Sequence, residues 1–319
     1  MSAVRPAFKF NWKLALTTVG IIVSALAVAF VINELVETRA LSTIDWSSPK
    51  VVASLSLGSL GYALISVLIA AAWAFLLKVM HPGASVLDAI FAHASTQILK
   101  YLPSNVLNQF GRAFLMKSKG TPLVASASSS VAEALLIASA GAILTVLLCP
   151  PGKLPELVST LRLPAAVLVL ISTAALSWLL TRYLNKTAKL AEVDVRSKTN
   201  LTLMAGTYVC YLAFFLLFGQ LLQETYSGIG QSSDTGTLVL AGAMAASWTI
   251  GFLTPGAAAG IGVREGALIV LLSPVVGTST ASLLAVSSRA INIGGDLILA
   301  LLGYVALSLH TSPRLPDGD

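Results

Sequence analysis

Residues 51–79 read VVASLSLGSLGYALISVLIAAAWAFLLKV, an apolar run in which Lys78 is the only charged residue. A run of more than about 18 apolar residues is a candidate membrane span, because a helix of that length crosses the hydrocarbon core of a bilayer. Further long apolar runs cover residues 14–32, 123–148, 163–184, 201–222 and 282–309. The sequence therefore predicts an all-α polytopic membrane protein.

The composition leads to the same fold class independently of any motif. Of the 319 residues, 56% are hydrophobic and 11% are charged, and the mean hydropathy is +0.85. Soluble domains carry roughly 25% charged residues, so this chain has too little polar surface to cover a soluble globule. We attribute the net charge of +6 to basic cytoplasmic loops and expect no nucleic-acid partner.

Basic residues are concentrated in the N-terminus and in residues 78–119 and 186–198, whereas loops 33–50 and 224–234 are relatively acidic. Cytoplasmic loops carry an excess of Lys and Arg, so this distribution predicts a cytoplasmic N-terminus. The run 14–32 is long, and no A-x-A-like cleavage site precedes a soluble domain, which favours an uncleaved span over a signal peptide. We expect a multi-pass protein of the bacterial inner membrane.

Two pairs of shorter helical segments are each broken by a proline. Residues 85–101 and 103–119 flank Pro103, and residues 237–253 and 263–272 flank a break at Pro255. One topology that agrees with the charges of all the loops has six full spans plus two re-entrant hairpins, which enter from opposite sides. The alternative topology has eight conventional spans. Irregular backbone at membrane depth is tolerated only inside protein or along a water-filled cavity, so either topology predicts a cavity at the breaks.

The two broken segments are similar to each other. Tyr101–Arg112 reads YLPSNVLNQFGR and Phe252–Arg264 reads FLTPGAAAGIGVR; in both, Pro precedes Arg by nine positions and a Gly lies just before the Arg. In each following helix a serine lies seven positions before a charged residue: Ser126 before Glu133, and Ser282 before Arg289. We expect one transmembrane domain over residues 1–319, built from inverted repeats of about 51–149 and 201–309, with the substrate at their interface.

Six charged side chains fall in or beside the predicted membrane segments, namely Arg112, Glu133, Arg264, Glu265, Arg289 and Asp296. Each costs a few kcal/mol at the bilayer centre unless it is paired or hydrated. They either pair internally, for example Arg289 with Asp296 or Arg264 with Glu133, or line a hydrated cavity in which Arg binds an anionic headgroup. Arg suits phosphate because its planar fork donates two parallel hydrogen bonds. Asn292 lies close to the helix face that carries Arg289 and Asp296.

Glycines 256, 260 and 262 would allow a phosphate to approach the backbone closely. A helix that begins near Gly262 would also direct free N–H groups towards that point. No Walker-type lysine follows, which argues against nucleotide binding. Cys149 and Cys210 are interpreted as packing residues and the three histidines are scattered, so we expect neither a metal nor another cofactor.

The segment Gly260–Gly266, GIGVREG, and the upstream Tyr101–Arg112 resemble the family of the lysylphosphatidylglycerol synthase transmembrane region, a flippase-like domain that also occurs as a standalone protein. The resemblance covers nearly the whole chain. It implies translocation of an anionic or aminoacylated lipid, or a polyprenyl-linked intermediate, between leaflets. It implies functional roles for Arg112, Arg264, Glu265 and Arg289. Glu133 departs from the basic residue of many relatives, which leaves the headgroup preference open.

We therefore expect a lipid transporter rather than an enzyme, with a membrane lipid as its substrate and a second copy or a pathway enzyme as a further partner. The soluble aminoacyl-transferase domain of the fused members is absent, so lipid aminoacylation is not expected. One alternative is a lipid-modifying glycosyltransferase that uses Glu34, Glu37 and Asp45 to hold a metal. Another is a proton-coupled transporter of small solutes, with Glu133 and Asp296 as proton carriers.

Overall fold

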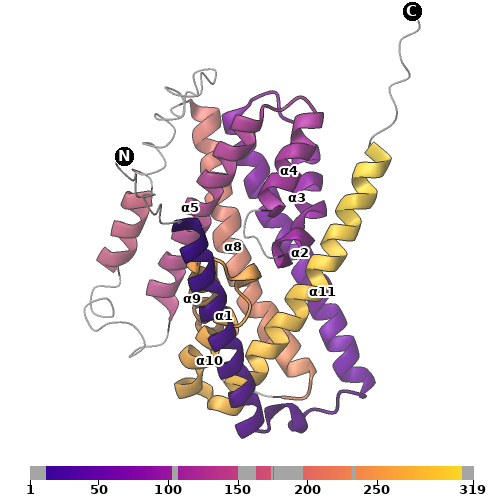
Figure 1. Ribbon diagram of the computed structural model, residues 1–319, viewed down its shortest axis with the longest axis vertical. Helices are drawn as coiled ribbons and strands as arrows, with labels where there is room; N and C mark the ends of the chain where they lie inside the picture. Colours follow the sequence, from indigo (N-terminus) through magenta and orange to yellow (C-terminus); the bar gives the residue numbers. More distant parts are fainter. Residues whose placement is uncertain are drawn as a thin grey trace, which may run out of the picture.

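The computed structural model describes residues 12–102, 107–149, 163–173, 175, 197–231 and 235–310, and every regular element in these residues is a helix (Figure 1). The α-helices are α1 (Trp12–Glu37), α2 (Pro49–Met80), α3 (Val86–Ser95), α4 (Leu107–Ser118), α5 (Leu123–Leu148), α8 (Lys198–Gly228), α9 (Thr237–Leu253), α10 (Val263–Val276) and α11 (Thr278–His310). Short 3-10 helices are η1 (Ala40–Thr43), η2 (Gln97–Tyr101) and η3 (Ala258–Gly260). A further apolar helix covers Leu163–Thr173.

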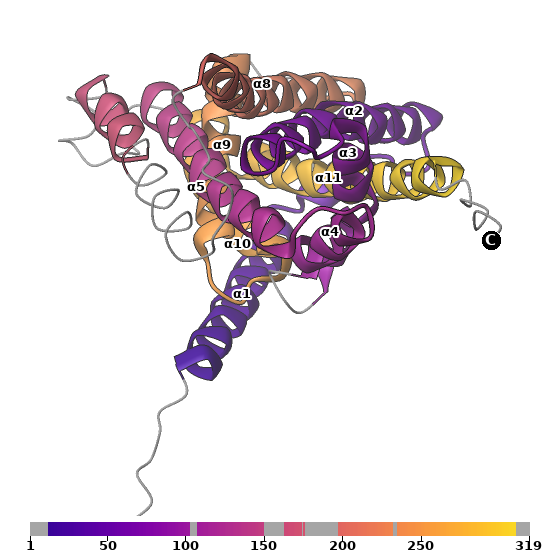
Figure 2. The same ribbon diagram turned by 90° about the horizontal axis from the view of Figure 1, so that it is seen from above.

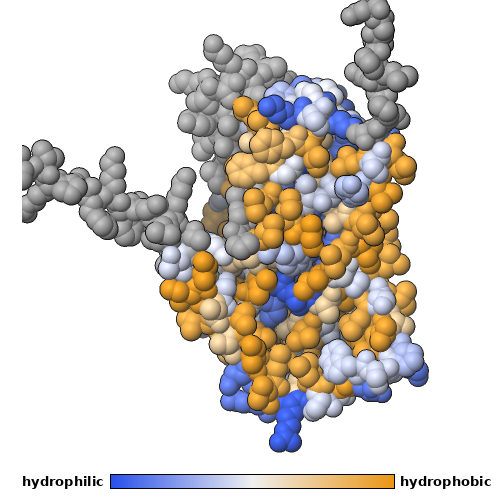
Figure 3. Space-filling view, turned by 45° about the vertical axis from the view of Figure 1, so that its right-hand side comes forward, coloured by the Kyte–Doolittle hydropathy of each residue, from blue (hydrophilic) through white to orange (hydrophobic). Residues whose placement is uncertain are grey.

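Five segments of the described residues are long and apolar enough to cross a membrane: Pro49–Met80, Leu123–Leu148, Lys198–Gly228, Ala258–Val276 and Thr278–His310. Their outer surfaces are apolar, and leucines such as Leu57, Leu64 and Leu301 are about two-thirds exposed. Figure 3 shows hydrophobic residues over most of one face of the molecule. The prediction of an all-α polytopic membrane protein is confirmed.

The centre of the bundle consists of helices that approach one another closely. Seen from above, α2, α3 and α11 lie next to one another between α8 and α4 (Figure 2). A Cβ atom on Gly295 of α11 would lie 2.6 Å from the backbone oxygen of Ser59 in α2, so only glycine fits at this contact. Small residues at helix contacts are typical of membrane bundles, in which close packing replaces the hydrophobic effect.

The two pairs of short helices occupy opposite ends of the bundle, with α3 and α4 in the upper half of Figure 1 and α9 and α10 in the lower half. Contacts along α11 agree with this arrangement. Gly303 lies against Ser95 at the end of α3, Asp296 bonds to Lys100 of η2, and Arg289 bonds to Glu265 at the start of α10. The tips of the two pairs meet, since η2 contacts η3.

The boundaries of the short helices differ in detail from the prediction. The arm predicted over residues 85–101 is α-helical only to Ser95 and continues as the 3-10 helix η2 to Tyr101. The helix predicted over residues 263–272 extends to Val276. At 14 residues α10 is about 21 Å long, shorter than the hydrocarbon core of about 30 Å.

Two features of the prediction fall partly or wholly outside the described residues. Pro103, the first predicted break, lies outside them, although η2 ends before it and α4 begins at Leu107. The span predicted over residues 163–184 is described as helix only for Leu163–Thr173. The second break is described in full: Pro255 lies between α9 and η3, and Ala259 has a left-handed backbone with φ of 49°.

Candidate functional site

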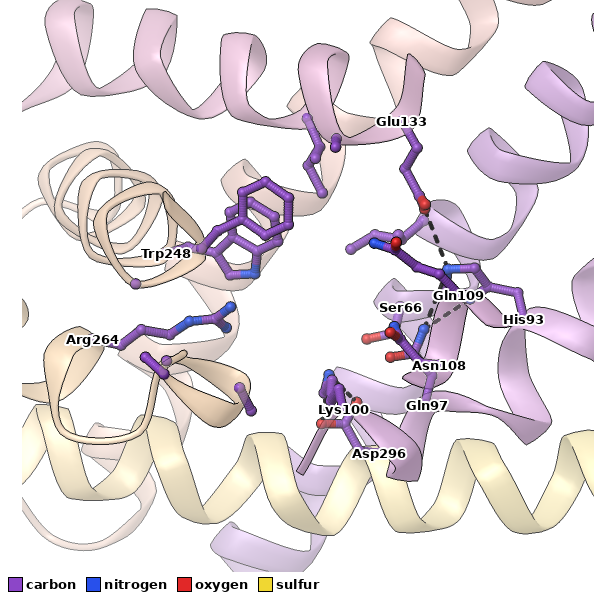
Figure 4. Close-up of a pocket in the computed structure, with 18 of the residues that line it drawn as sticks. Ser66, His93, Gln97, Lys100, Asn108, Gln109, Glu133, Trp248, Arg264 and Asp296 are labelled. Atoms are coloured by element: carbon purple, nitrogen blue, oxygen red, sulfur yellow. Dashed lines mark hydrogen bonds and ion pairs between the residues drawn. The ribbon is translucent and has the colours of Figure 1, made fainter. Parts of the chain in front are cut away.

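A polar cavity lies where the two pairs of short helices meet. Its walls come from α2, α3, η2, α4, α5, α9, η3, α10 and α11. Its volume is about 140 Å³. This space corresponds to about five water molecules, since each takes about 30 Å³ in the liquid. Figure 4 shows Arg264 and Trp248 on one side and Gln97, His93 and Glu133 on the other.

Arg264 projects into the cavity from the first turn of α10, and it has no anionic partner. No hydrogen bond or ion pair joins its guanidinium group to any residue that the structure describes, and its Nε is buried without a partner. The guanidinium carbon instead lies 5.0 Å from the centre of the Trp248 ring. Trp248 in turn stacks on Phe252 with 4.9 Å between the ring centres. The aromatic pair therefore holds the cation in place without neutralising it.

Two glycines leave room for the Arg264 side chain. A Cβ atom on Gly260 would lie 2.7 Å from Nε of Arg264, and a Cβ on Gly251 would overlap its Cγ. Gly260 also has a φ of 68°, a left-handed conformation that glycine adopts without strain. Gly262, with a φ of 79°, faces α1 instead, where a Cβ would meet Val28 at 2.7 Å. Gly251 and Gly260 therefore make room for the Arg264 side chain, and Gly262 allows close contact with α1.

Arg112 lies on the opposite side of the cavity and forms an ion pair, although its Nε is buried without a hydrogen-bond partner. Its guanidinium donates to both carboxylate oxygens of Glu133, at 3.2 Å from Nη1 to Oε1 and in a short contact from Nη2, and to Ser130 Oγ at 3.0 Å. Its face also stacks on Trp73 at 4.3 Å. His93 completes the group, with Nε2 3.4 Å from Glu133 Oε1. Glu133 thus neutralises Arg112 at a point where 2% of that arginine is exposed.

Asp296 of α11 is held by the tip of the upper pair of short helices. Lys100 Nζ lies 2.9 Å and 2.8 Å from its two carboxylate oxygens, and the Tyr101 hydroxyl donates to Oδ2 at 2.6 Å. Asp296 is 1% exposed, so these donors replace water around the carboxylate. The interaction ties η2 to α11.

Glu265 and Arg289 form a third ion pair, behind the cavity wall. Arg289 Nε donates to Glu265 Oε1 at 2.6 Å, and the other oxygen of Glu265 accepts from the backbone N–H of Gly262 at 2.7 Å. The carboxylate of Glu265 therefore already occupies the N-terminus of α10, which the sequence predicted to be open to an anionic ligand. A glutamate at this position caps the helix and interacts favourably with its dipole.

The cavity brings together some of the residues that the sequence singled out. Arg112, Glu133, Gly260, Arg264 and Asp296 line it. Glu265, Arg289, Asn292, Gly262 and Pro255 are not among the lining residues. Neither of the ion pairs suggested as examples is formed: Arg289 pairs with Glu265 instead of Asp296, and Glu133 pairs with Arg112 instead of Arg264.

Several lining residues were not recognised in the sequence: Lys100, His93, Gln97, Asn108, Gln109 and Trp248. His93, Gln97 and Lys100 were visible as interruptions of an otherwise apolar helix pattern, which could have marked them as facing a polar interior. Trp248 gave no such signal, because a tryptophan in an apolar helix is expected to face lipid or core.

The acidic residues of the first loop do not form a metal site. Asp45 Oδ1 accepts from the backbone N–H and the hydroxyl of Ser47, and these hydrogen bonds lower the pKa of its carboxyl. Among the described residues, no group of three or more His, Cys, Asp or Glu side chains is arranged to bind a metal ion.

The surroundings of the cavity thus combine one unpaired arginine, two neutralised carboxylates and several uncharged amides. Such a site can bind an anion and hydrogen-bond a polar group beside it. No model of a known protein family matches the chain, and no curated protein matches it in sequence.

Proposed function

We propose that this protein translocates an anionic or polyprenyl-linked lipid between membrane leaflets and binds the lipid headgroup at Arg264. The observation that carries the proposal is the unpaired Arg264 guanidinium in a polar cavity between two pairs of short helices. An unpaired cation inside a membrane bundle costs several kcal/mol. A phosphate would offset that cost and would accept parallel hydrogen bonds from the arginine fork.

The helix arrangement supports movement of a headgroup across the membrane. We propose that α3 with α4 and α9 with α10 are re-entrant hairpins of an inverted repeat, entering from opposite sides. Their tips meet at the cavity, and a headgroup there would be shielded from both ends of the bundle. Figure 3 shows hydrophilic residues at mid-height among hydrophobic ones, where a headgroup could enter while its chains stay in lipid.

We also propose a bacterial inner membrane location with the N-terminus in the cytoplasm. Support comes from the ends of the helices. One end of the bundle carries Lys78, Lys117, Lys119 and Lys198. The other carries Glu34, Glu37, Asp45 and Glu224 beside Arg39 and Lys50. The excess of basic residues marks the first end as cytoplasmic.

Leaflet transfer of labelled lipid in proteoliposomes tests the function. Purified protein is reconstituted with acyl-labelled phosphatidylglycerol or with a labelled polyprenyl monophosphate hexose, and the label that a membrane-impermeant quencher reaches is followed over time. We expect faster transfer than in protein-free vesicles. Arg264→Gln should slow it at least tenfold, because the only unpaired cation of the described cavity is lost.

Lys117→Gln is the matched control, because it removes one positive charge at an exposed position at the end of α4. It should transfer lipid at the wild-type rate. If no anionic lipid moves faster with protein, and Arg264→Gln behaves as the wild type, the proposal is wrong. Uptake of a water-soluble solute into sealed vesicles by the same preparation would favour the solute transporter instead.

A further inference from the structure

We infer that the cavity selects a headgroup with a single negative charge and a neutral, hydroxyl-bearing substituent, that is, a phosphodiester of a sugar or of glycerol. This inference rests on the proposed function, because it names the class of lipid that the site would take. It follows from the charges that line the cavity, from the contacts of His93, and from the amides opposite Arg264.

The first step is the charge balance of the lining. The charged side chains that face the cavity are three cations, Lys100, Arg112 and Arg264, and two carboxylates, Glu133 and Asp296. Arg112 is paired with Glu133 and Lys100 with Asp296. One positive charge is left, on Arg264. A ligand with one negative charge would make the occupied site neutral, whereas a diphosphate would leave negative charge uncompensated in a low dielectric.

The second step concerns His93, the histidine of the lining. Gln97 Nε2 lies 2.9 Å from His93 Nδ1 and 3.3 Å from His93 Nε2, and His93 Nε2 lies 3.4 Å from Glu133 Oε1. When the amide N–H donates to Nδ1, the shorter contact, the imidazole carries its proton on Nε2, next to the carboxylate. This tautomer is neutral and satisfies both contacts. His93 therefore adds no second positive charge to the cavity.

The third step is the side of the cavity that faces Arg264. Figure 4 places Gln97, Asn108 and Gln109 there. Asn108 Oδ1 is buried without a hydrogen-bond partner. Uncharged amides both donate and accept, which matches the hydroxyl groups of a polyol. An ammonium headgroup would need a carboxylate, and both carboxylates of the lining are already bound by cations.

The size of the cavity agrees with this class of ligand. Space for about five water molecules matches a phosphate with a small hydroxyl-bearing substituent such as glycerol. A headgroup of several sugars would have to extend beyond the cavity.

Competitive lipid binding to the full-length protein, followed by native mass spectrometry, tests the inference without any transport step. The probes are phosphatidylglycerol, a polyprenyl monophosphate hexose, phosphatidic acid and phosphatidylethanolamine. We expect the first two to bind at least tenfold more tightly than the others, and the stronger of them identifies the source of the headgroup. Phosphatidic acid has no polyol and a monoester phosphate with more than one charge near neutral pH, and phosphatidylethanolamine is zwitterionic.

A charge-switch variant sharpens the test. Gln109→Lys adds a second cation opposite Arg264 and should shift the preference towards phosphatidic acid, whereas Lys117→Arg, a change at an exposed position, should leave the order of the lipids unchanged. A wild-type preference for phosphatidic acid or for phosphatidylethanolamine overturns the inference, as does the absence of any preference. These wild-type results decide the matter even if Gln109→Lys does not fold.

The result is separable from that of the transfer experiment. Selective binding of a phosphodiester polyol without leaflet transfer would reject the proposed function and keep the binding site. Leaflet transfer with equal binding of all four lipids would keep the proposed function and reject the inferred headgroup preference.

Discussion

Three interior arginines have different surroundings, and their functions should differ accordingly. Arg112 is paired with Glu133, Arg289 with Glu265, and Arg264 only stacks on Trp248. A paired buried arginine contributes to stability mainly because its partner would otherwise be left alone. An unpaired buried arginine reduces stability, and we propose that Arg264 serves ligand binding. Stability and ligand binding should therefore respond in opposite ways to substitution at these positions.

Removal of the Glu133 charge tests whether the ion pair with Arg112 contributes to stability. Glu133→Gln leaves Arg112 buried beside an uncharged amide, and we expect a loss of about 3–5 kcal/mol in the free energy of unfolding. The measurement is thermal denaturation in detergent. Arg264→Gln should leave the melting temperature unchanged or raise it, because no described ion pair is lost. A lower melting temperature for Arg264→Gln than for Glu133→Gln would contradict this assignment.

The contact between Gly260 and Arg264 can be tested with a matched glycine. Gly260→Ala places a Cβ where Arg264 Nε now lies and forces a left-handed alanine, and the strain alone costs about 1–2 kcal/mol. Gly120 follows α4 in a left-handed turn with a φ of 87°, and a Cβ there would meet nothing within 4 Å, so Gly120→Ala carries a comparable strain without the contact. Both variants should lose stability, and only Gly260→Ala should also lose lipid binding. Equal binding by the two would show that Arg264 does not depend on this glycine.

At the scale of elements, two ion pairs connect the short helices to α11. Asp296 holds η2 through Lys100 and Tyr101, and Arg289 holds the start of α10 through Glu265. Asp296 and Arg289 are seven residues apart, about 10 Å along a helix. Helix α11 therefore acts as the common support that sets how far apart the tips of the two pairs lie.

A double-mutant cycle tests the connection between η2 and α11. Asp296→Asn should destabilise the protein, because Lys100 loses its carboxylate in a largely buried setting. Lys100→Gln added to Asp296→Asn should recover part of that loss, since no unpaired cation then remains. We expect a coupling energy of about 0.5–3 kcal/mol from melting curves of the four proteins. Additive effects of the two substitutions would mean that the ion pair does not hold the tip.

At the scale of the whole molecule, the two pairs of short helices lie at opposite ends of a bundle whose outer surface is apolar (Figure 1). The ends of the long helices differ in charge, as the described lysines near α4 and the acidic residues near η1 show. A single orientation in the membrane should follow from that asymmetry.

Cysteine accessibility in intact cells tests the orientation. Ser118→Cys lies exposed at the end of α4, and Ser42→Cys lies exposed in η1 at the opposite end. A membrane-impermeant thiol reagent should label Ser42→Cys from outside and Ser118→Cys only after the membrane is opened. The parent chain, whose Cys149 is buried and Cys210 half-buried, provides the background. The opposite labelling pattern would reverse the proposed topology.

Hydrophobic patterning was sufficient to predict the fold class, most of the helix positions and the break at Pro255. These features depend on neighbouring residues and on the length that a bilayer requires, so they can be derived from short stretches of sequence. Arg264 could be singled out as a candidate site residue for the same reason, because glycines lie close to it on both sides in the sequence.

The pairing of the charges could not be derived in this way. The bonded partners are 21, 24 and 196 positions apart in the chain, and one of them, Lys100, was not recognised as a site residue. Any of the arginines could have neutralised any of the carboxylates, because spacing along a helix limits only pairs on the same helix. The packing of the short helices against α5 and α11 selected the pairs, and it thereby left Arg264 as the cation of the cavity without a partner.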